Sequence, residues 1–112
     1  VECLDDGVEA DLHGLDVEVP PGLALTAYRV VQESLTNVRK HAGPDARPRV
    51  CVRVADDVRI TVEDDGRGAA APDDGHGHGL QGMRERVALH EGRFQAGPRP
   101  GGGFRVHAEL PL

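Results

Sequence analysis

The sequence predicts an α+β fold: a two-layer sandwich in which a mixed, mostly antiparallel sheet carries helices on one face. Two observations lead to this prediction. Apolar and polar residues alternate in several short segments, which is typical of strands with one buried face. Two longer segments instead repeat their apolar residues every three or four positions, as amphipathic helices do. Strands with a single apolar face need a cover, and the two helices supply it.

Two helices are predicted from this spacing. The first spans about residues 23–42 and ends before Gly43 and Pro44, which do not continue a helix. Its apolar stripe consists of Ala24, Ala27, Tyr28, Val31, Leu35, Val38 and Ala42. The second begins at Leu80, repeats apolar residues at helical spacing and ends near Gly92.

Five short segments show the alternation that is typical of strands. They are residues 16–19, 50–54, 58–62, 93–96 and 104–110. The second and third of these form an antiparallel hairpin around a tight turn at Asp56 and Asp57, with their valines and isoleucine on one face. His13 is expected in a surface loop before the first strand, and a long polar loop occupies residues 64–79.

Composition limits the number of domains, the partners and the compartment. The 112 residues suffice for one domain, residues 1–112, whose net charge of −6 argues against nucleic acid or a membrane surface as a partner. Cys3 and Cys51 lie far apart, so we expect two reduced thiols and a cytoplasmic location. No stretch reaches the ~18 apolar residues of a membrane span. The chain begins at Val1 rather than Met, and we expect it to be part of a longer protein.

The stretch from Gly77 to Gly82 has the spacing G-x-G-x-x-G, which also occurs in dinucleotide-binding folds. Here it follows a loop rather than a strand, and no acidic residue stands about 20 positions further on, which disfavours that function. Gly77 and Gly79 still permit a ligand to approach the backbone closely. Leu80 then starts a helix whose free N–H groups favour an anion such as phosphate. The alternative is a solvent-exposed loop at a helix start.

Residues 62–68, VEDDGRG, place an acidic pair and two glycines at the end of a predicted strand. Asp64 lies just past the strand, where its carboxylate can point into a pocket. Because a carboxylate only accepts hydrogen bonds, it suits the exocyclic amine of adenine and rejects the oxygen of guanine. Gly66 and Gly68 leave room for a flat ring. The alternative is a hairpin turn with solvated carboxylates.

The first predicted helix carries a third set of polar residues within ESLTN, residues 33–37. Glu33 and Asn37 are four positions apart and share one face, away from the apolar stripe. The amide oxygen of Asn37 suits Mg²⁺, which keeps water and phosphate oxygens as its other ligands. Glu33 can take a proton from a nucleophile. Lys40 and His41 extend this face and could meet phosphate oxygens, although a solvated helix face is the alternative.

These three segments, in this order on a helix, a strand end and a helix start, closely resemble the ATP-binding catalytic domain of bacterial two-component sensor histidine kinases. That domain has the GHKL, or Bergerat, ATPase fold, which it shares with DNA gyrase B. Within the NarL/DesK-like subfamily, residues 26–42 resemble the N box, residues 62–68 the G1 box and residues 77–87 the G2 box. Residues 101–112 are similar to the subfamily's last strand, so the resemblance covers almost the whole chain.

The resemblance implies a domain that binds ATP and Mg²⁺ and assigns roles to individual residues. Asn37 would coordinate the Mg²⁺ that bridges the ATP phosphates, and Glu33 would polarise or deprotonate an acceptor histidine. Asp64 would bond the adenine amine, while Gly66 and Gly68 would shape the base pocket.

The resemblance also implies phosphate contacts where the two predicted helices end and begin. Lys40 and His41 would touch phosphates from the first helix. Contacts with the nucleotide from the second helix would come from Gly77, His78, Gly79 and Leu80. A mobile lid over the nucleotide would comprise roughly residues 69–78.

By the same resemblance, the full-length kinase would donate the γ-phosphoryl group of ATP to a histidine on its dimerisation domain, from which an aspartate of a response regulator takes it. None of the six histidines of this chain stands in an acceptor motif, so little turnover is expected of the isolated domain. In the family dimerisation belongs to helices outside this domain, so the resemblance also implies a monomer. Glu91 replaces a glycine that the family often has, and Phe104 replaces a common threonine. Two alternatives remain: a stand-alone anti-sigma-factor serine kinase, and a degenerate module that binds without catalysis.

Overall fold

The computed structural model describes residues 2–3, 9–14, 16–41, 46–66 and 77–112. Within these ranges the chain forms six strands and two helices. In chain order they are β1 (Glu2–Cys3), β2 (Glu9–His13), α1 (Pro21–His41), β3 (Arg49–Val54), β4 (Asp57–Glu63), α2 (Gly77–Leu89), β5 (Arg93–Pro98) and β6 (Phe104–Pro111).

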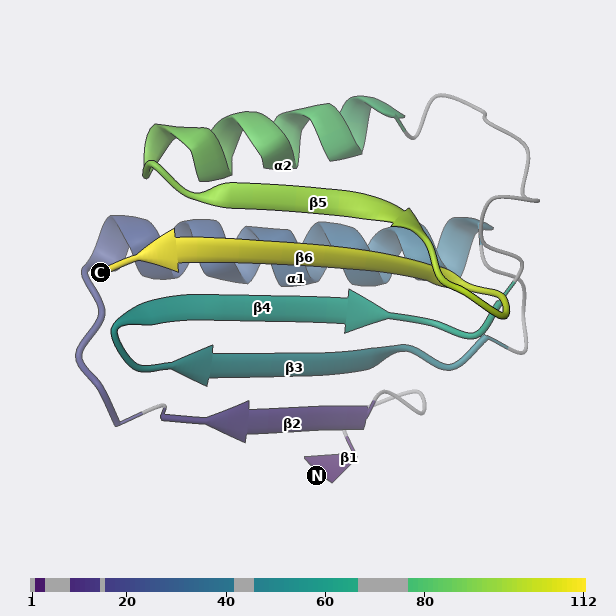
Figure 1. Ribbon diagram of the computed structural model, residues 1–112, viewed down its shortest axis with the longest axis horizontal. Helices are drawn as coiled ribbons and strands as arrows, with labels where there is room; N and C mark the ends of the chain where they lie inside the picture. The colour runs from purple at the N-terminus through teal and green to yellow at the C-terminus, as the bar shows by residue number, and fades with distance from the viewer. Residues whose placement is uncertain (1, 4–8, 15, 42–45, 67–76) are drawn as a thin grey trace.

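The strands form a single mixed sheet with the order β1-β2-β3-β4-β6-β5 (Figure 1). Strands β2 and β3 are parallel, and the other neighbours are antiparallel. Helix α1 packs on β4 and β6, and α2 packs on β5 and β6, so both helices cover the same face. The predicted two-layer α+β sandwich is therefore confirmed.

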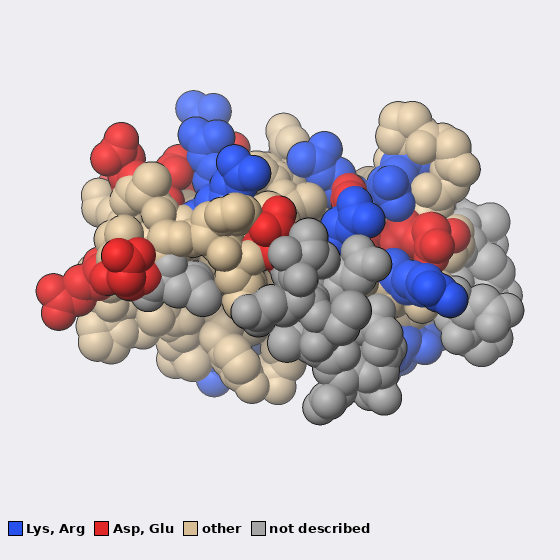
Figure 2. Space-filling view, turned by 90° about the horizontal axis from the view of Figure 1, so that it is seen from below, with Lys and Arg blue, Asp and Glu red and all other residues tan. Residues whose placement is uncertain are grey.

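The other face of the sheet is covered by no helix of the described chain, and charged side chains line it. Arg49, Glu63 and Arg105 lie next to one another in register across β3, β4 and β6. Seen from the β1 edge, basic and acidic side chains gather along one side of the molecule (Figure 2). Such side chains keep this face solvated without a further layer.

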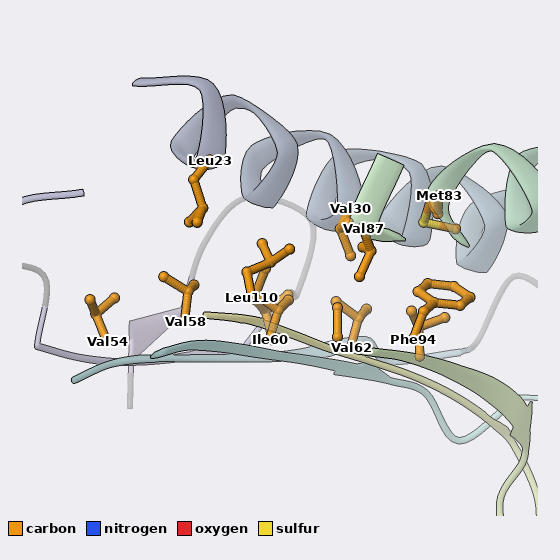
Figure 3. Packing of buried hydrophobic residues seen from close by; sticks show 13 residues of the cluster. Leu23, Val30, Val54, Val58, Ile60, Val62, Met83, Val87, Phe94 and Leu110 are labelled. Carbon is orange, nitrogen blue, oxygen red and sulfur yellow. The ribbon is translucent and has the colours of Figure 1, made fainter. Parts of the chain in front are cut away.

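The core lies between the two helices and the sheet (Figure 3). The alternation predicted for the central strands is confirmed, because Val58, Ile60 and Val62 are buried whereas Arg59 is exposed. Further buried side chains come from both helices and from β6, namely Leu23, Val30, Met83, Val87, Val106, Ala108 and Leu110.

The predicted stripe of the first helix is rotated relative to the buried face of α1. Tyr28, assigned to the stripe, is 61% exposed, whereas Val30 is fully buried and Ser34 is nearly so. The cause is that α1 packs against α2 as well as the sheet, so polar Thr26 and Ser34 are buried between the helices. An apolar pattern alone does not show a helix–helix contact that is made by polar side chains.

The strand predicted at residues 16–19 is wrong. These residues form a turn and irregular chain, in which the Val17 N–H donates to the Gly14 carbonyl at 3.1 Å. The sheet instead takes β2 beside β3, and His13, predicted in a loop, is the last residue of β2. Gly14 ends the strand with a φ of 74°, where a side chain would also overlap the carbonyl of Val54.

The other predicted boundaries are shifted by a few residues. Helix α1 begins at Pro21, a favourable first residue because proline has no N–H to leave unpaired. Helix α2 begins at Gly77, three residues before the predicted start at Leu80, and ends at Leu89. Strand β4 already begins at Asp57, which was predicted in the turn.

Cys51 is a free thiol. Neither helix in the described part of the chain is long and apolar enough to cross a membrane.

A Schellman motif ends α2 and places Glu91 in a conformation that favours glycine. The N–H of Gly92 donates to the Val87 carbonyl at 3.0 Å, and the N–H of Glu91 donates to the Ala88 carbonyl at 2.9 Å. Glu91 has a φ of 59°, which crowds its Cβ against the backbone. The departure from the family's glycine noted in the sequence therefore falls on the C-cap of α2.

We predict that Glu91→Gly stabilises the domain by about 1 kcal/mol, because glycine adopts this φ without the steric penalty. Urea denaturation measures the change. The control is Glu85→Gly, an exposed position within α2, which should instead destabilise the domain by about 1 kcal/mol. A Glu91→Gly variant that is no more stable than the wild type would contradict the prediction.

Candidate functional site

The two helices run antiparallel, which brings the end of α1 to the start of α2. Near the start of α1, Thr26 Oγ1 lies 3.0 Å from Nε2 of His90, just past the end of α2. Further along, the Ser34 hydroxyl donates to Met83 Sδ at 3.6 Å. One more turn along α1 leads to Asn37, and one turn back along α2 leads to Leu80. These two contacts and the spacing of helical turns place Asn37 level with the opening turn of α2.

The same end of the molecule holds the end of β4 and the loop that joins β5 to β6 (Figure 1). Consequently, the segments that carry the three motifs meet at one end of the sandwich, although they are far apart in the sequence.

The side chain of Asn37 is half-buried and incompletely bonded. Its Nδ2 is buried, with no hydrogen-bond partner in the part of the chain that the structure describes. A buried amide without a partner is unfavourable in a folded protein, and such groups often mark a binding site. Glu33, one turn earlier on the same face, is also half-buried and has no ion pair with another described residue. Lys40 is exposed one turn beyond Asn37.

The opening turn of α2 begins within the glycine-rich stretch. Because the helix starts at Gly77, the first N–H groups without helical partners belong to the glycine segment itself rather than to residues after Leu80. Leu80 is half-buried and packs against the core, so it anchors this turn. The positive end of the helix dipole is thus presented at the same end as Asn37.

Several predicted site residues can be placed only in part. His41 is the last residue of α1, and His78 and Gly79 lie in the first turn of α2, but the side chains of the two histidines are outside the described set. Gly68 and most of the predicted lid, residues 69–76, lie outside the described residues altogether.

Asp64 follows the last residue of β4 and is only 3% exposed. Its Oδ1 accepts a hydrogen bond from the Gly66 N–H at 2.8 Å. This burial contradicts the alternative of a solvated turn for Asp64. It also raises the pKa of the Asp64 carboxyl above its ordinary value of 3.8. The bond from Gly66 and the charge of Arg99 oppose the increase, whereas the neighbouring charge of Asp65 adds to it.

The main chain of Asp64 is held by residues at the start of β6 and in the loop before it. The Asp64 N–H donates to the Phe104 carbonyl at 3.0 Å, and the Asp64 carbonyl accepts a bond from Nη1 of Arg99 at 2.8 Å. Gly103 lies so close that a Cβ there would overlap the Asp64 carbonyl oxygen. Neither Arg99 nor Gly103 was predicted from the sequence. The run of glycines before β6 was a signal for Gly103, but nothing local marks Arg99.

Comparison with known protein families shows the family of this chain. Residues 22–112 match the sequence profile of a family described as "Histidine kinase-, DNA gyrase B-, and HSP90-like ATPase". The match covers most of the chain, and the chain belongs to this family. The resemblance indicated by the three motifs is thereby confirmed, and the site lies in an ATP-binding type of domain.

Named relatives and solved structures agree with this assignment. The chain is 33% identical to the sensor histidine kinase LnrJ of Bacillus subtilis over 98% of its own length and 28% of LnrJ. It is 36% identical to the histidine-protein kinase/phosphatase UhpB of Salmonella typhimurium over 78% of its length and 17% of UhpB. It therefore spans less than a third of the length of these relatives.

Among solved structures, the histidine kinase domain of the Erythrobacter litoralis EL346 blue-light activated histidine kinase superposes with a TM-score of 0.74. The two chains are 28% identical, and the match covers 96% of this chain and 56% of the other. The catalytic domain of histidine kinase ThkA matches with a TM-score of 0.69 at 17% identity, over 94% of this chain and 78% of that one, which supports the fold.

We predict that Asp64→Asn weakens ATP binding by about 1–3 kcal/mol, because an amide nitrogen would face the adenine amine where a charged acceptor stood. Calorimetry with Mg-ATP measures this loss. Unchanged affinity would show that the base does not bind at Asp64.

The same variant has a predicted effect on stability. The raised pKa of Asp64 means that folding favours its protonated form, so this group's contribution to stability is present below pH 3.8 and is lost as the pH rises through the folded-state pKa. As the pH rises through the folded-state pKa of Asp64, the ligand-free wild type should therefore lose stability relative to Asp64→Asn. Parallel stability curves for the two proteins would contradict the raised pKa.

A further prediction compares two glycines of the β5–β6 loop. Gly103→Ala should destabilise the domain more than Gly101→Ala, because both have a positive φ, 91° and 86°, but only Gly103 lies against Asp64. A Cβ at Gly101 would meet nothing within 4 Å. Thermal unfolding of both variants measures the difference. Equal losses would show that backbone strain alone, and not the contact with Asp64, accounts for the effect.

Proposed function

We propose that this domain binds Mg-ATP and, within a full-length kinase, donates the γ-phosphoryl group to a histidine of the dimerisation domain in two-component signalling. The observation that carries the proposal is that a buried carboxylate, Asp64, and a buried amide nitrogen without a described partner, that of Asn37, belong to segments that end where α2 begins. Each group is unfavourable in the folded chain without a ligand, and one nucleotide can satisfy both.

The base would bind at Asp64. A buried, ionised carboxylate accepts a hydrogen bond from the exocyclic amine of adenine, and guanine presents an oxygen there instead. The bond from Gly66 fixes one carboxylate oxygen and leaves the group able to accept another bond. Gly66 and Gly68 would leave space for the ring.

The triphosphate would lie between the end of α1 and the start of α2. The N–H groups of Gly77, His78 and Gly79 suit phosphate oxygens, and Lys40 and His41 would add contacts from α1. Asn37 fits a Mg²⁺ ligand, because no described residue bonds its Nδ2 and the amide can therefore turn its oxygen toward a metal. When bound there, Mg²⁺ would neutralise part of the charge of the phosphates.

Glu33 would act on the acceptor histidine. One ring nitrogen attacks the γ-phosphorus, the bond from this phosphorus to the bridging oxygen breaks, and ADP leaves with that oxygen. The Glu33 carboxylate accepts the hydrogen bond, and then the proton, of the other ring nitrogen, which makes the attacking nitrogen more nucleophilic. Its lack of an ion pair among the described residues keeps it available for this role.

The partners follow from this chemistry. The acceptor histidine belongs to the dimerisation domain of the same kinase, and a response regulator takes the phosphoryl group from it. The relatives named above are sensor histidine kinases, which favours this function over a stand-alone anti-sigma-factor serine kinase. We further propose that the domain works in the cytoplasm and is monomeric when isolated.

The experiment combines the full-length kinase with ATP labelled at the γ-phosphate. We expect acid-labile phosphohistidine, and its absence in a kinase that is folded and binds ATP would overturn the proposed transfer.

In the same assay, Glu33→Gln should slow phosphohistidine formation roughly 100-fold, because a neutral amide cannot take the proton. Its affinity for ATP should stay close to that of the wild type. Glu85→Gln, an exposed position on α2, is the control and should change neither quantity. Wild-type transfer by Glu33→Gln would remove Glu33 from the mechanism.

A further inference from the structure

Arg99 lies in the loop between β5 and β6, outside every motif of the sequence, yet it bonds the main chain of Asp64. We infer that Arg99 is a positioning residue that fixes the direction of the Asp64 carboxylate and thereby the choice of adenine over guanine. This inference rests on the function proposed above and assigns the specificity of that site to a residue that does not touch the nucleotide.

The first step concerns the peptide groups on either side of Asp64. Register pairing between β4 and β6 ends with Glu63 opposite Arg105, so Asp64 lies just beyond the ladder. Its N–H still bonds the Phe104 carbonyl at 3.0 Å, but its carbonyl has no strand partner and is held by Nη1 of Arg99 at 2.8 Å. Because two fixed peptide planes determine the Cα–Cβ direction, Arg99 supplies half of what orients the carboxylate.

The second step concerns the rigidity of Arg99 itself. Its N–H donates to the Gly103 carbonyl at 3.0 Å, and its own carbonyl accepts a bond from Gly102 at 3.1 Å. Its Nε lies 3.7 Å from a carboxylate oxygen of Glu63, and its side chain is only 33% exposed. A planar guanidinium can hold the Asp64 carbonyl and Glu63 together, which a lysine ammonium does less well.

The third step concerns the side from which Arg99 acts. It lines a cavity of about 250 Å³ together with Arg47, Pro48, Arg49, Glu63 and Asp65. Arg49 is the register partner of Glu63 across β3 and β4. The next pair along these strands, Val50 and Val62, faces the core, so Arg49 and Glu63 face the opposite side of the sheet. The cavity is therefore on the face opposite the helices, and besides Pro48 and Asp65 its lining residues are Arg47, Arg49, Glu63 and Arg99. Arg99 thus acts on the base through Asp64.

The charge of Arg99 supports the same role. It opposes the rise in the pKa of Asp64 that burial causes, and so favours the ionised form that accepts the adenine amine.

The test measures the affinities of the chain for Mg-ATP and Mg-GTP by calorimetry in the wild type and in Arg99→Met. We expect the variant to bind ATP about tenfold more weakly and GTP within about twofold of the wild type, so that the preference for ATP falls about tenfold. Arg105→Met is the matched control. Arg105 faces Glu63 from β6 on the same side of the sheet and has no bond to Asp64. The Arg105→Met variant should therefore prefer ATP over GTP as strongly as the wild type does.

A merely structural role would weaken both nucleotides in parallel, and an unchanged ratio in a folded Arg99→Met variant would overturn the inference. Should Arg99→Met not fold, Arg99→Lys decides by the same ratio: a fall of about threefold or more supports the inference, and no change overturns it. Asp64→Asn distinguishes an error in the proposed base pocket from an error in the role of Arg99. If it leaves ATP binding unchanged, the proposed base pocket is wrong; if it weakens ATP binding while Arg99→Met keeps the ratio, only the role of Arg99 is wrong.

Discussion

The structure depends at its functional end on one unfavourable arrangement, the burial of the Asp64 carboxylate where β4 ends. A buried carboxylate loses hydration that backbone hydrogen bonds, among them the one from Gly66, only partly replace, and its raised pKa reflects this loss. The chain keeps the group in place by fixing its backbone from β6 and from Arg99. A rigid acceptor in a water-poor setting suits the recognition of one hydrogen-bond donor, and it leaves the ligand-free domain less stable than it could be.

The second constraint is the antiparallel contact between the helices. It is made by polar pairs, Thr26 with His90 and Ser34 with Met83, and it determines which residues of α1 meet the opening turn of α2. Asn37 then reaches that turn with a buried amide that no described residue satisfies. An amide that is left unpaired by the fold, beside free N–H groups, is a natural place for phosphate and its metal.

The sequence predicted the parts of this arrangement that repeat locally. The valine and isoleucine alternation of β3 and β4 exposes one apolar face, so both strands were found, and α1 and α2 follow from their periodicity. Strand β2 was missed because its place in the sheet is defined by backbone bonds to its neighbours β1 and β3, which local alternation does not show. The alternation at residues 16–19 was misleading for the same reason. Asp64, Asn37 and Glu33 could be proposed from local motifs, whereas Arg99 reaches Asp64 across 35 positions and no local pattern predicts such a contact.

The central claim is that one nucleotide joins Asp64 at the base to Asn37 at the phosphates. A crystal structure of the chain with Mg²⁺ and a non-hydrolysable ATP analogue tests it most directly. The account predicts the adenine amine within hydrogen-bond distance of the Asp64 carboxylate, and the metal on the side-chain oxygen of Asn37. A nucleotide bound elsewhere, for example in the arginine-lined cavity on the opposite face of the sheet, or one that leaves either side chain without a contact, would contradict it.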